Sequence, residues 1–125
     1  MYWNTTYPKV RVVAQELWPP GEVRLGQTNY VRTKSMLPNL IFQHSSTAIL
    51  VVGGLGVNGT ALNSIEILEL SDQDYQPLFQ GSGSWEVMRH HLNEPRAYYP
   101  SLSVLNGRLI VAGGKASTPN RSQHT

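Results

Sequence analysis

The chain has 125 residues, 40% of them hydrophobic, so it supplies at most one domain with a core of ordinary size. Its net charge is only +2 and its basic residues form no run, which argues against a nucleic-acid partner. It has no cysteine, which excludes disulfides and thiolate metal sites, while eleven glycines and eight prolines indicate many short strands and an all-β fold.

The start of the chain lacks both the basic segment and the apolar segment of a signal peptide. No stretch of the sequence has the length of about 18 consecutive apolar residues that a membrane-spanning helix needs. We therefore expect no membrane partner, and an intracellular location is favoured.

Two strands are predicted in the first third of the chain. Residues 9–17 alternate loosely between apolar and polar and carry β-branched side chains, before a breaker at residues 18–21. Residues 28–36 predict the second strand by the same pattern.

The next segment predicts a hairpin whose second strand is buried on both faces. Residues 47–54 hold an uninterrupted apolar run that ends in Gly53-Gly54, and residues 40–44 form the expected first strand, with a turn at Ser45-Ser46. Ser46-Thr47 is a poor type I′ turn, because neither residue accepts a positive φ cheaply. We therefore expect a loose turn.

The glycine-rich residues 55–62 predict a loop. A phosphate-binding loop is rejected, because the dinucleotide glycine spacing, the Gly-Lys-Ser/Thr ending and a following helix are all absent from the pattern. Residues 63–70 then predict a strand that presents Glu66 and Glu69 on one acidic, solvated face.

Residues 71–84 are polar and predict a surface-loop insertion, which costs little stability. Asp72, Asp74 and Tyr75 make this loop a candidate contact surface for a partner, and an inert insertion is the alternative. Residues 85–88 predict an outer strand, with Trp85 as a packing residue. His90 and His91 point to opposite sides of an extended segment, so we interpret them as surface residues and predict no metal site.

The clearest motif lies near the end of the chain. Residues 97–105 are strand-like, Asn106-Gly107 predicts a two-residue type I′ turn with positive φ at both positions, and residues 108–114 predict a buried strand ending in Gly113-Gly114. The second diglycine strand repeats the first, so the chain contains a repeat. Residues 115–125 predict a frayed polar tail.

Trp85, the sequence Glu94-Pro95-Arg96 and the hairpin at residues 101–114 together resemble the kelch repeat, whose blades form a β-propeller. The kelch pattern has a tryptophan on the outer strand, Pro-Arg before the next blade, and a hairpin whose inner strand ends in Gly-Gly. The resemblance assigns repeat roles to Gly53, Gly54, Trp85, Arg96, Asn106, Gly107, Gly113 and Gly114.

The resemblance implies an incomplete kelch-type β-propeller with antiparallel blades. Residues 1–36 would be the last two strands of a partial blade, and residues 37–96 would be a full blade with an insertion near residues 71–84. Residues 97–114 would be the first hairpin of the next blade, and residues 115–125 would be a tail. It also implies that Trp85 packs on the bare backbone of Gly53-Gly54, and that Arg96 holds the blade junction through bonds to backbone carbonyls.

The function that the resemblance implies is a protein–protein interaction module. A propeller needs four to eight blades of about 50 residues, so we expect a fragment of a longer propeller or adaptor protein whose unpaired strand edges favour self-association. We expect no enzyme activity, cofactor or metal. The alternatives are a fragment of a propeller enzyme related to galactose oxidase, whose site needs a cysteine, and a degenerate piece without independent function.

Overall fold

A computed structural model describes residues 8–26, 28–34, 46–72, 74–78, 84–105 and 108–114, and these residues are mostly β. The predicted β-rich fold is confirmed at this level. The elements are α1 (Pro8–Glu16), β1 (Arg24–Leu25), β2 (Tyr30–Lys34), β3 (Ser46–Gly56), β4 (Ala61–Ser71), β5 (Glu86–Val87), β6 (Ser101–Leu105) and β7 (Arg108–Ala112).

The first element is a helix, so the strand predicted at residues 9–17 is wrong. Pro8 occupies the first helical position, where its missing N–H and fixed φ are tolerated. In a strand, Val13 and Ala14 would point to opposite faces, whereas in a helix both share one face with Leu17. These three side chains pack into the core while Val12 is exposed, which is the pattern of an amphipathic helix.

The main sheet has five antiparallel strands and is built around β3. One edge of β3 is covered by β1 and β2, and the other edge is covered by β4, whose outer edge in turn pairs with β5. Of the predicted strand at residues 28–36, residues 30–34 are confirmed as β2. Residues 47–54 are also confirmed as part of a buried strand.

The hairpin predicted between residues 40–44 and 47–54 is wrong. Residues 40–44 lie outside the described residues, but β2 already holds the edge of β3 that this hairpin would need, with Tyr30 opposite Val51 and Lys34 opposite Thr47. Ser46 and Thr47 are ladder residues opposite Ser71 and Leu70, and not a turn. Since β2 pairs with residues 47–51 along this edge and β4 pairs along the other edge, β2 is the first strand of the meander β2-β3-β4-β5.

The predicted glycine-rich loop is shorter than residues 55–62, because β3 continues to Gly56 and β4 begins at Ala61. The turn between them is closed by a bond from the Thr60 N–H to the Asn58 side-chain oxygen at 3.1 Å, and Gly59 has φ +82°. β4 confirms the strand predicted at residues 63–70.

The second sheet is the hairpin β6–β7, paired from Ser101 opposite Ala112 to Leu105 opposite Arg108. This register confirms the predicted hairpin, while Asn106 and Gly107 lie outside the described residues and their turn type stays a prediction. Exposure alternates along β7, so the buried strand predicted at residues 108–114 is wrong. The reason is that β7 packs through one face only, and Gly113 and Gly114 lie beyond its end.

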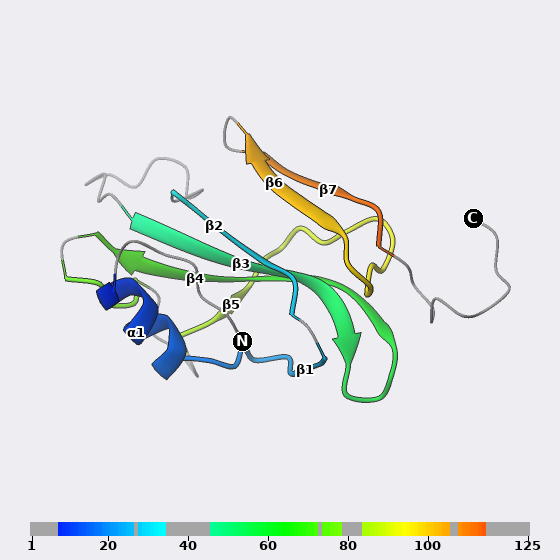
Figure 1. Ribbon diagram of the computed structural model, residues 1–125, viewed down its shortest axis with the longest axis horizontal. Helices are drawn as coiled ribbons and strands as arrows, with labels where there is room; N and C mark the ends of the chain where they lie inside the picture. Colours follow the sequence, from blue (N-terminus) through cyan, green and yellow to red (C-terminus); the bar gives the residue numbers. More distant parts are fainter. Residues whose placement is uncertain are drawn as a thin grey trace, which may run out of the picture.

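Figure 1 shows α1 and the β6–β7 hairpin on opposite sides of the main sheet. Two core clusters match these two faces. On the α1 face, the buried members are Ala14, Ile49, Val51, Leu68, Leu70 and Trp85. On the hairpin face they are Ala48, Leu50, Val52, Ile65 and Ile67, against which the inward residues of β6 and β7 pack. Among the described residues, no helix is long and apolar enough to cross a bilayer.

Candidate functional site

The Gly53-Gly54 pair lies inside β3, where the ladder with β4 shifts register between Val52 and Gly54. Both glycines have positive φ, +56° and +106°. A Cβ at Gly53 would lie 2.4 Å from the Arg96 carbonyl oxygen, and a Cβ at Gly54 would lie 3.0 Å from Cδ of Arg24. Because Gly53 has no side chain, the Arg96 backbone can approach it closely, and because Gly54 has none, the aliphatic part of the Arg24 side chain can pack against it.

Arg24 is the residue that packs on this diglycine. Its Nε donates to the Gly53 carbonyl, and its Nη1 donates to Glu66 Oε2 at 2.8 Å and to the Glu22 carbonyl at 2.6 Å. The side chains of Arg24 and Glu66 are each 1% exposed, so the ion pair is buried. Sequence reasoning did not single out Arg24, because a two-residue strand with one basic residue carries no motif.

Glu66 is a buried acceptor, so the solvated acidic face predicted for β4 is wrong. Its two carboxylate oxygens accept the N–H groups of Gly21 at 2.9 Å and Glu22 at 3.2 Å, in addition to Arg24. Glu69 is buried on the other face and accepts the Ser46 hydroxyl at 2.8 Å. Residues three apart in a strand point to opposite faces, and this spacing alone could have excluded one shared acidic face.

Arg96 contacts both diglycines. Its carbonyl accepts the Gly54 N–H at 2.8 Å, its own N–H donates to the Leu62 carbonyl at 3.0 Å, and its Nη1 donates to the Gly113 carbonyl. The polar bond to a backbone carbonyl that was predicted for this side chain is present. A Cβ at Gly114 would lie 3.0 Å from Cβ of Pro100 and 3.3 Å from Cβ of Arg96.

The two diglycines therefore share one arrangement. In each, the first glycine's carbonyl accepts an arginine side chain, Arg24 at Gly53 and Arg96 at Gly113. In each, both glycines have positive φ, which is +75° at Gly113 and +77° at Gly114. The similarity between the two diglycine strands thus includes the arginine side chain that binds the first glycine of each pair.

Trp85 lies away from both diglycines, so the predicted packing on Gly53-Gly54 is wrong. Its Nε1 donates to the Leu17 carbonyl at 2.7 Å, and its ring meets that of Trp18 edge to face at 5.6 Å. It is 7% exposed and belongs to the core beneath α1. The Leu17 carbonyl and the Trp18 ring, directly after α1, supply the contacts that the glycines were expected to supply.

The predicted contact loop is partly turned inward. Asp72 accepts the Thr47 hydroxyl at 2.7 Å and the Lys34 ammonium at 2.9 Å. Burial raises the pKa of the Asp72 carboxyl, but the bonds from Thr47 and Lys34 and the charge of Lys34 outweigh burial, so its pKa lies below the ordinary value. Tyr75 packs against the core below α1, and Asp74 is exposed. Asp72 and Tyr75 thus have structural roles here.

The segment at residues 88–96 follows β5 and runs beside β4. The Met88 N–H donates to the Ile65 carbonyl and the Leu92 N–H to the Asn63 carbonyl, both at 2.8 Å. His90 and His91 are exposed, as predicted. Among the residues that the structure describes, no group of three or more His, Cys, Asp or Glu residues could hold a metal ion.

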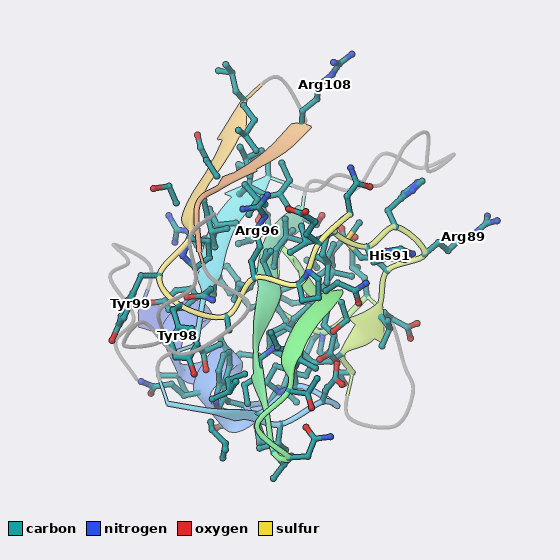
Figure 2. All side chains as sticks on the ribbon, turned by 90° about the vertical axis from the view of Figure 1, so that its right-hand side faces the viewer. Arg89, His91, Arg96, Tyr98, Tyr99 and Arg108 are labelled. Carbon is teal, nitrogen blue, oxygen red and sulfur yellow. The ribbon has the colours of Figure 1, made fainter. Side chains whose placement is uncertain are left out.

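A hollow of about 380 Å³, which we call the hairpin cleft, opens between this segment, the main sheet and β7. Its apolar walls are Leu50, Ile65, Met88, Leu92, Leu109 and Val111, and its polar residues are His90, His91, Asn93 and Arg96. Figure 2 shows Arg96 near the base of the hairpin and His91 on the segment after β5, while Arg89 points away from the molecule.

Another hollow, of about 310 Å³, lies beside the first diglycine strand and is lined by Leu25, Leu55, Tyr98 and Tyr99 among others. Figure 2 shows Tyr98 and Tyr99 close together, on the opposite side of the molecule from His91. Tyr99 is 71% exposed and has φ +54°, a backbone conformation that bulky residues rarely adopt.

The chain matches no family model, no curated protein and no solved structure among known proteins.

Proposed function

We propose that the chain is a protein–protein interaction module of the kelch-repeat type and forms part of a longer propeller or adaptor protein. The support is an antiparallel meander of four strands, β2-β3-β4-β5, followed by a hairpin that packs on one face of the meander. Blades of a propeller are four-stranded antiparallel sheets arranged around a common axis. In this proposal the meander is one blade and β6–β7 begins the next.

The observation that carries the proposal is a difference between the two diglycine strands. β3 is paired along both edges, by β2 and β4, whereas β7 is paired with β6 alone among the described residues. Because Gly113 corresponds to Gly53, the open edge of β7 corresponds to the edge of β3 that β4 covers. An open strand edge presents unpaired N–H and C=O groups, which a strand from another protein can bind by adding to the sheet.

An apolar side chain beside this edge favours a protein partner. Ile110 on β7 is 48% exposed, on the solvent face of the hairpin. A partner strand that pairs with β7 would cover part of this side chain. The partner can be the following segment of a longer protein, another protein, or a second copy of this chain.

Self-association of the purified chain tests the proposal, because a second copy carries the same open edge. Size-exclusion chromatography with light scattering, over a range of concentrations, should give a mass that rises above the monomer. Ile110→Lys should hold the mass at the monomer, since lysine on an edge strand blocks pairing. Ser103→Lys is the matched control, because Ser103 is exposed on the same face but lies on β6. A mass that stays monomeric throughout, or that falls equally in both variants, would refute association through β7.

A further inference from the structure

The hairpin cleft combines apolar walls with polar groups that donate or carry positive charge. Leu50 and Ile65 of the main sheet form its floor, and Leu109 and Val111 of β7 form the facing wall. The cleft is thus bounded by two different sheets. A volume of about 380 Å³ lies within the range of pockets that hold small ligands.

The polar lining of the hairpin cleft contains a positive charge and no negative charge among the described residues. None of the described residues that line the cleft is acidic, and its polar members are two imidazoles, an amide and the Arg96 guanidinium. Glu94 is the acidic residue paired with Arg96, but its carboxylate is 3.7 Å away and its side chain is 78% exposed. The positive charge of Arg96 is therefore only weakly compensated at the cleft.

Arg96 also has donor capacity beyond its contact with the hairpin. A guanidinium carries five N–H donors in a planar arrangement, and Nη1 of Arg96 donates one of them to the Gly113 carbonyl. The side chain is 27% exposed, so the remaining donors are partly shielded from water. Arginine donors in this setting bind carboxylates well, because charge-assisted bonds gain strength when water is partly removed.

We propose that the hairpin cleft binds a small amphipathic carboxylate, with its carboxylate at Arg96 and its hydrocarbon body between the main sheet and β7. The volume suits an aliphatic chain of roughly ten carbons, at the lower end of ligand-sized pockets. A compact anion such as inorganic phosphate would leave the apolar walls uncovered. A neutral alcohol of equal length would leave the guanidinium donors without an anionic partner. The cleft shares Leu109 and Val111 with β7, but the proposal rests on the lining residues and not on the proposed partner strand.

The test uses decanoate and 1-decanol as probes with the whole chain, below the concentrations at which either aggregates. Amide shifts in ¹H–¹⁵N correlation spectra should change on addition of decanoate for residues 88–96 and 109–111, on the two sides of the cleft. Decanol should bind at least about tenfold more weakly, because it forms no charge-assisted bond with Arg96. Equal affinity for both probes would overturn the carboxylate assignment.

Asn93 provides a matched pair of variants at the rim of the cleft, where it is exposed. Asn93→Glu and Asn93→Gln have nearly the same size and differ by one negative charge. Asn93→Glu should weaken decanoate binding several-fold while decanol binding stays unchanged, and Asn93→Gln should bind both probes as the parent chain does. Decanoate binding that is unaffected by Asn93→Glu, or shifts confined to residues outside the cleft, would show that the ligand binds elsewhere.

Arg96→Gln tests the anchor itself and should lower decanoate affinity by about tenfold or more. Glutamine is shorter than arginine and loses the bond from Nη1 to the Gly113 carbonyl, so circular dichroism must first show that the variant folds. If this variant does not fold, the Asn93 pair still decides the question. A folded Arg96→Gln chain that binds decanoate as tightly as the parent would refute the proposal.

Discussion

Arg24 and Glu66 form an ion pair of 2.8 Å in which both side chains are 1% exposed, although 42 residues separate them in the sequence. The pair attaches the short strand β1 and the preceding turn to β4, while the Arg24 stem covers Gly54. A buried charge that loses its partner is costly, so this contact ties the N-terminal segment to the main sheet more firmly than exposed ion pairs do.

Glu66→Gln should destabilise the fold by about 3 to 5 kcal/mol, because the variant keeps the size of the side chain but leaves the Arg24 charge buried without compensation. Urea denaturation followed by circular dichroism measures the free energy of unfolding. Glu22→Gln is the control: Glu22 is 45% exposed and 4.0 Å from Arg24, and its loss should cost below about 1 kcal/mol. Equal losses of unfolding free energy in the two variants would show that the buried ion pair contributes no more to stability than the exposed one.

Gly53→Ala should cost about 2 to 5 kcal/mol, the sum of a left-handed backbone conformation and a clash with the Arg96 carbonyl, 2.4 Å from the new Cβ. Gly59→Ala is the comparison variant, because it introduces the backbone strain without the clash. Gly59 also has positive φ, but nothing lies within 4 Å of its Cβ position, so it should cost only about 1 to 2 kcal/mol. Thermal and chemical denaturation of both variants give the comparison. A Gly53→Ala chain as stable as Gly59→Ala would contradict the close approach of Arg96.

Trp85→Ala should destabilise the chain by about 3 to 5 kcal/mol, because it opens a cavity beneath α1 and removes the bond to the Leu17 carbonyl. Trp85→Phe fills most of the space and should cost less, with a contribution of about 1 to 3 kcal/mol from the carbonyl left unsatisfied. Val87→Ala, at a residue that is 64% exposed, should change stability by under about 0.5 kcal/mol. If Trp85→Ala proved as mild as Val87→Ala, the packing under the helix would be wrong.

Asp72→Asn should remove a small contribution to stability that depends on pH. The folded-state pKa of Asp72 is lowered, so the unfolded chain binds the proton more readily. The contribution is therefore complete above the unfolded pKa of about 3.9 and is lost as pH falls through the lower folded value. Lys34 is 80% exposed, so the difference at pH 7 should stay below about 1 kcal/mol. Urea denaturation from pH 7 to pH 2.5 checks this, and a difference that grows toward low pH would contradict it.

The strands with local signals could be predicted from the sequence. The apolar run before Gly53-Gly54 and the Asn106-Gly107 dipeptide between two strand-like segments led to β3 and to the β6–β7 hairpin. Asn58-Gly59 carries the same dipeptide signal for the β3–β4 turn, but the glycines around it favoured a longer loop. Local turn chemistry is readable because it depends only on the φ preferences of the turn residues.

The features that depend on distant partners could not be predicted. Nothing local distinguishes a solvated Glu66 from one buried against Arg24, and nothing local places Trp85 on the end of α1 rather than on Gly53-Gly54. The α1 helix was missed because Val13, Ala14 and Leu17 also fit a loose strand alternation when read in a short window. In a segment of only nine residues, the apolar pattern fits both the helical and the strand periodicity, and tertiary packing decides which structure forms.

The central claim is that the open edge of β7 binds another strand, and hydrogen–deuterium exchange measured at several protein concentrations tests it most directly. At low concentration the outward amides of residues 108–112 should exchange fast while those of β3, paired on both edges, stay protected. As concentration rises, the β7 amides should gain protection and those of β3 should not change, and Ile110→Lys should abolish the gain. A molecular mass that rises with concentration while the exchange of β7 stays constant would contradict the claim, because association would then use another surface.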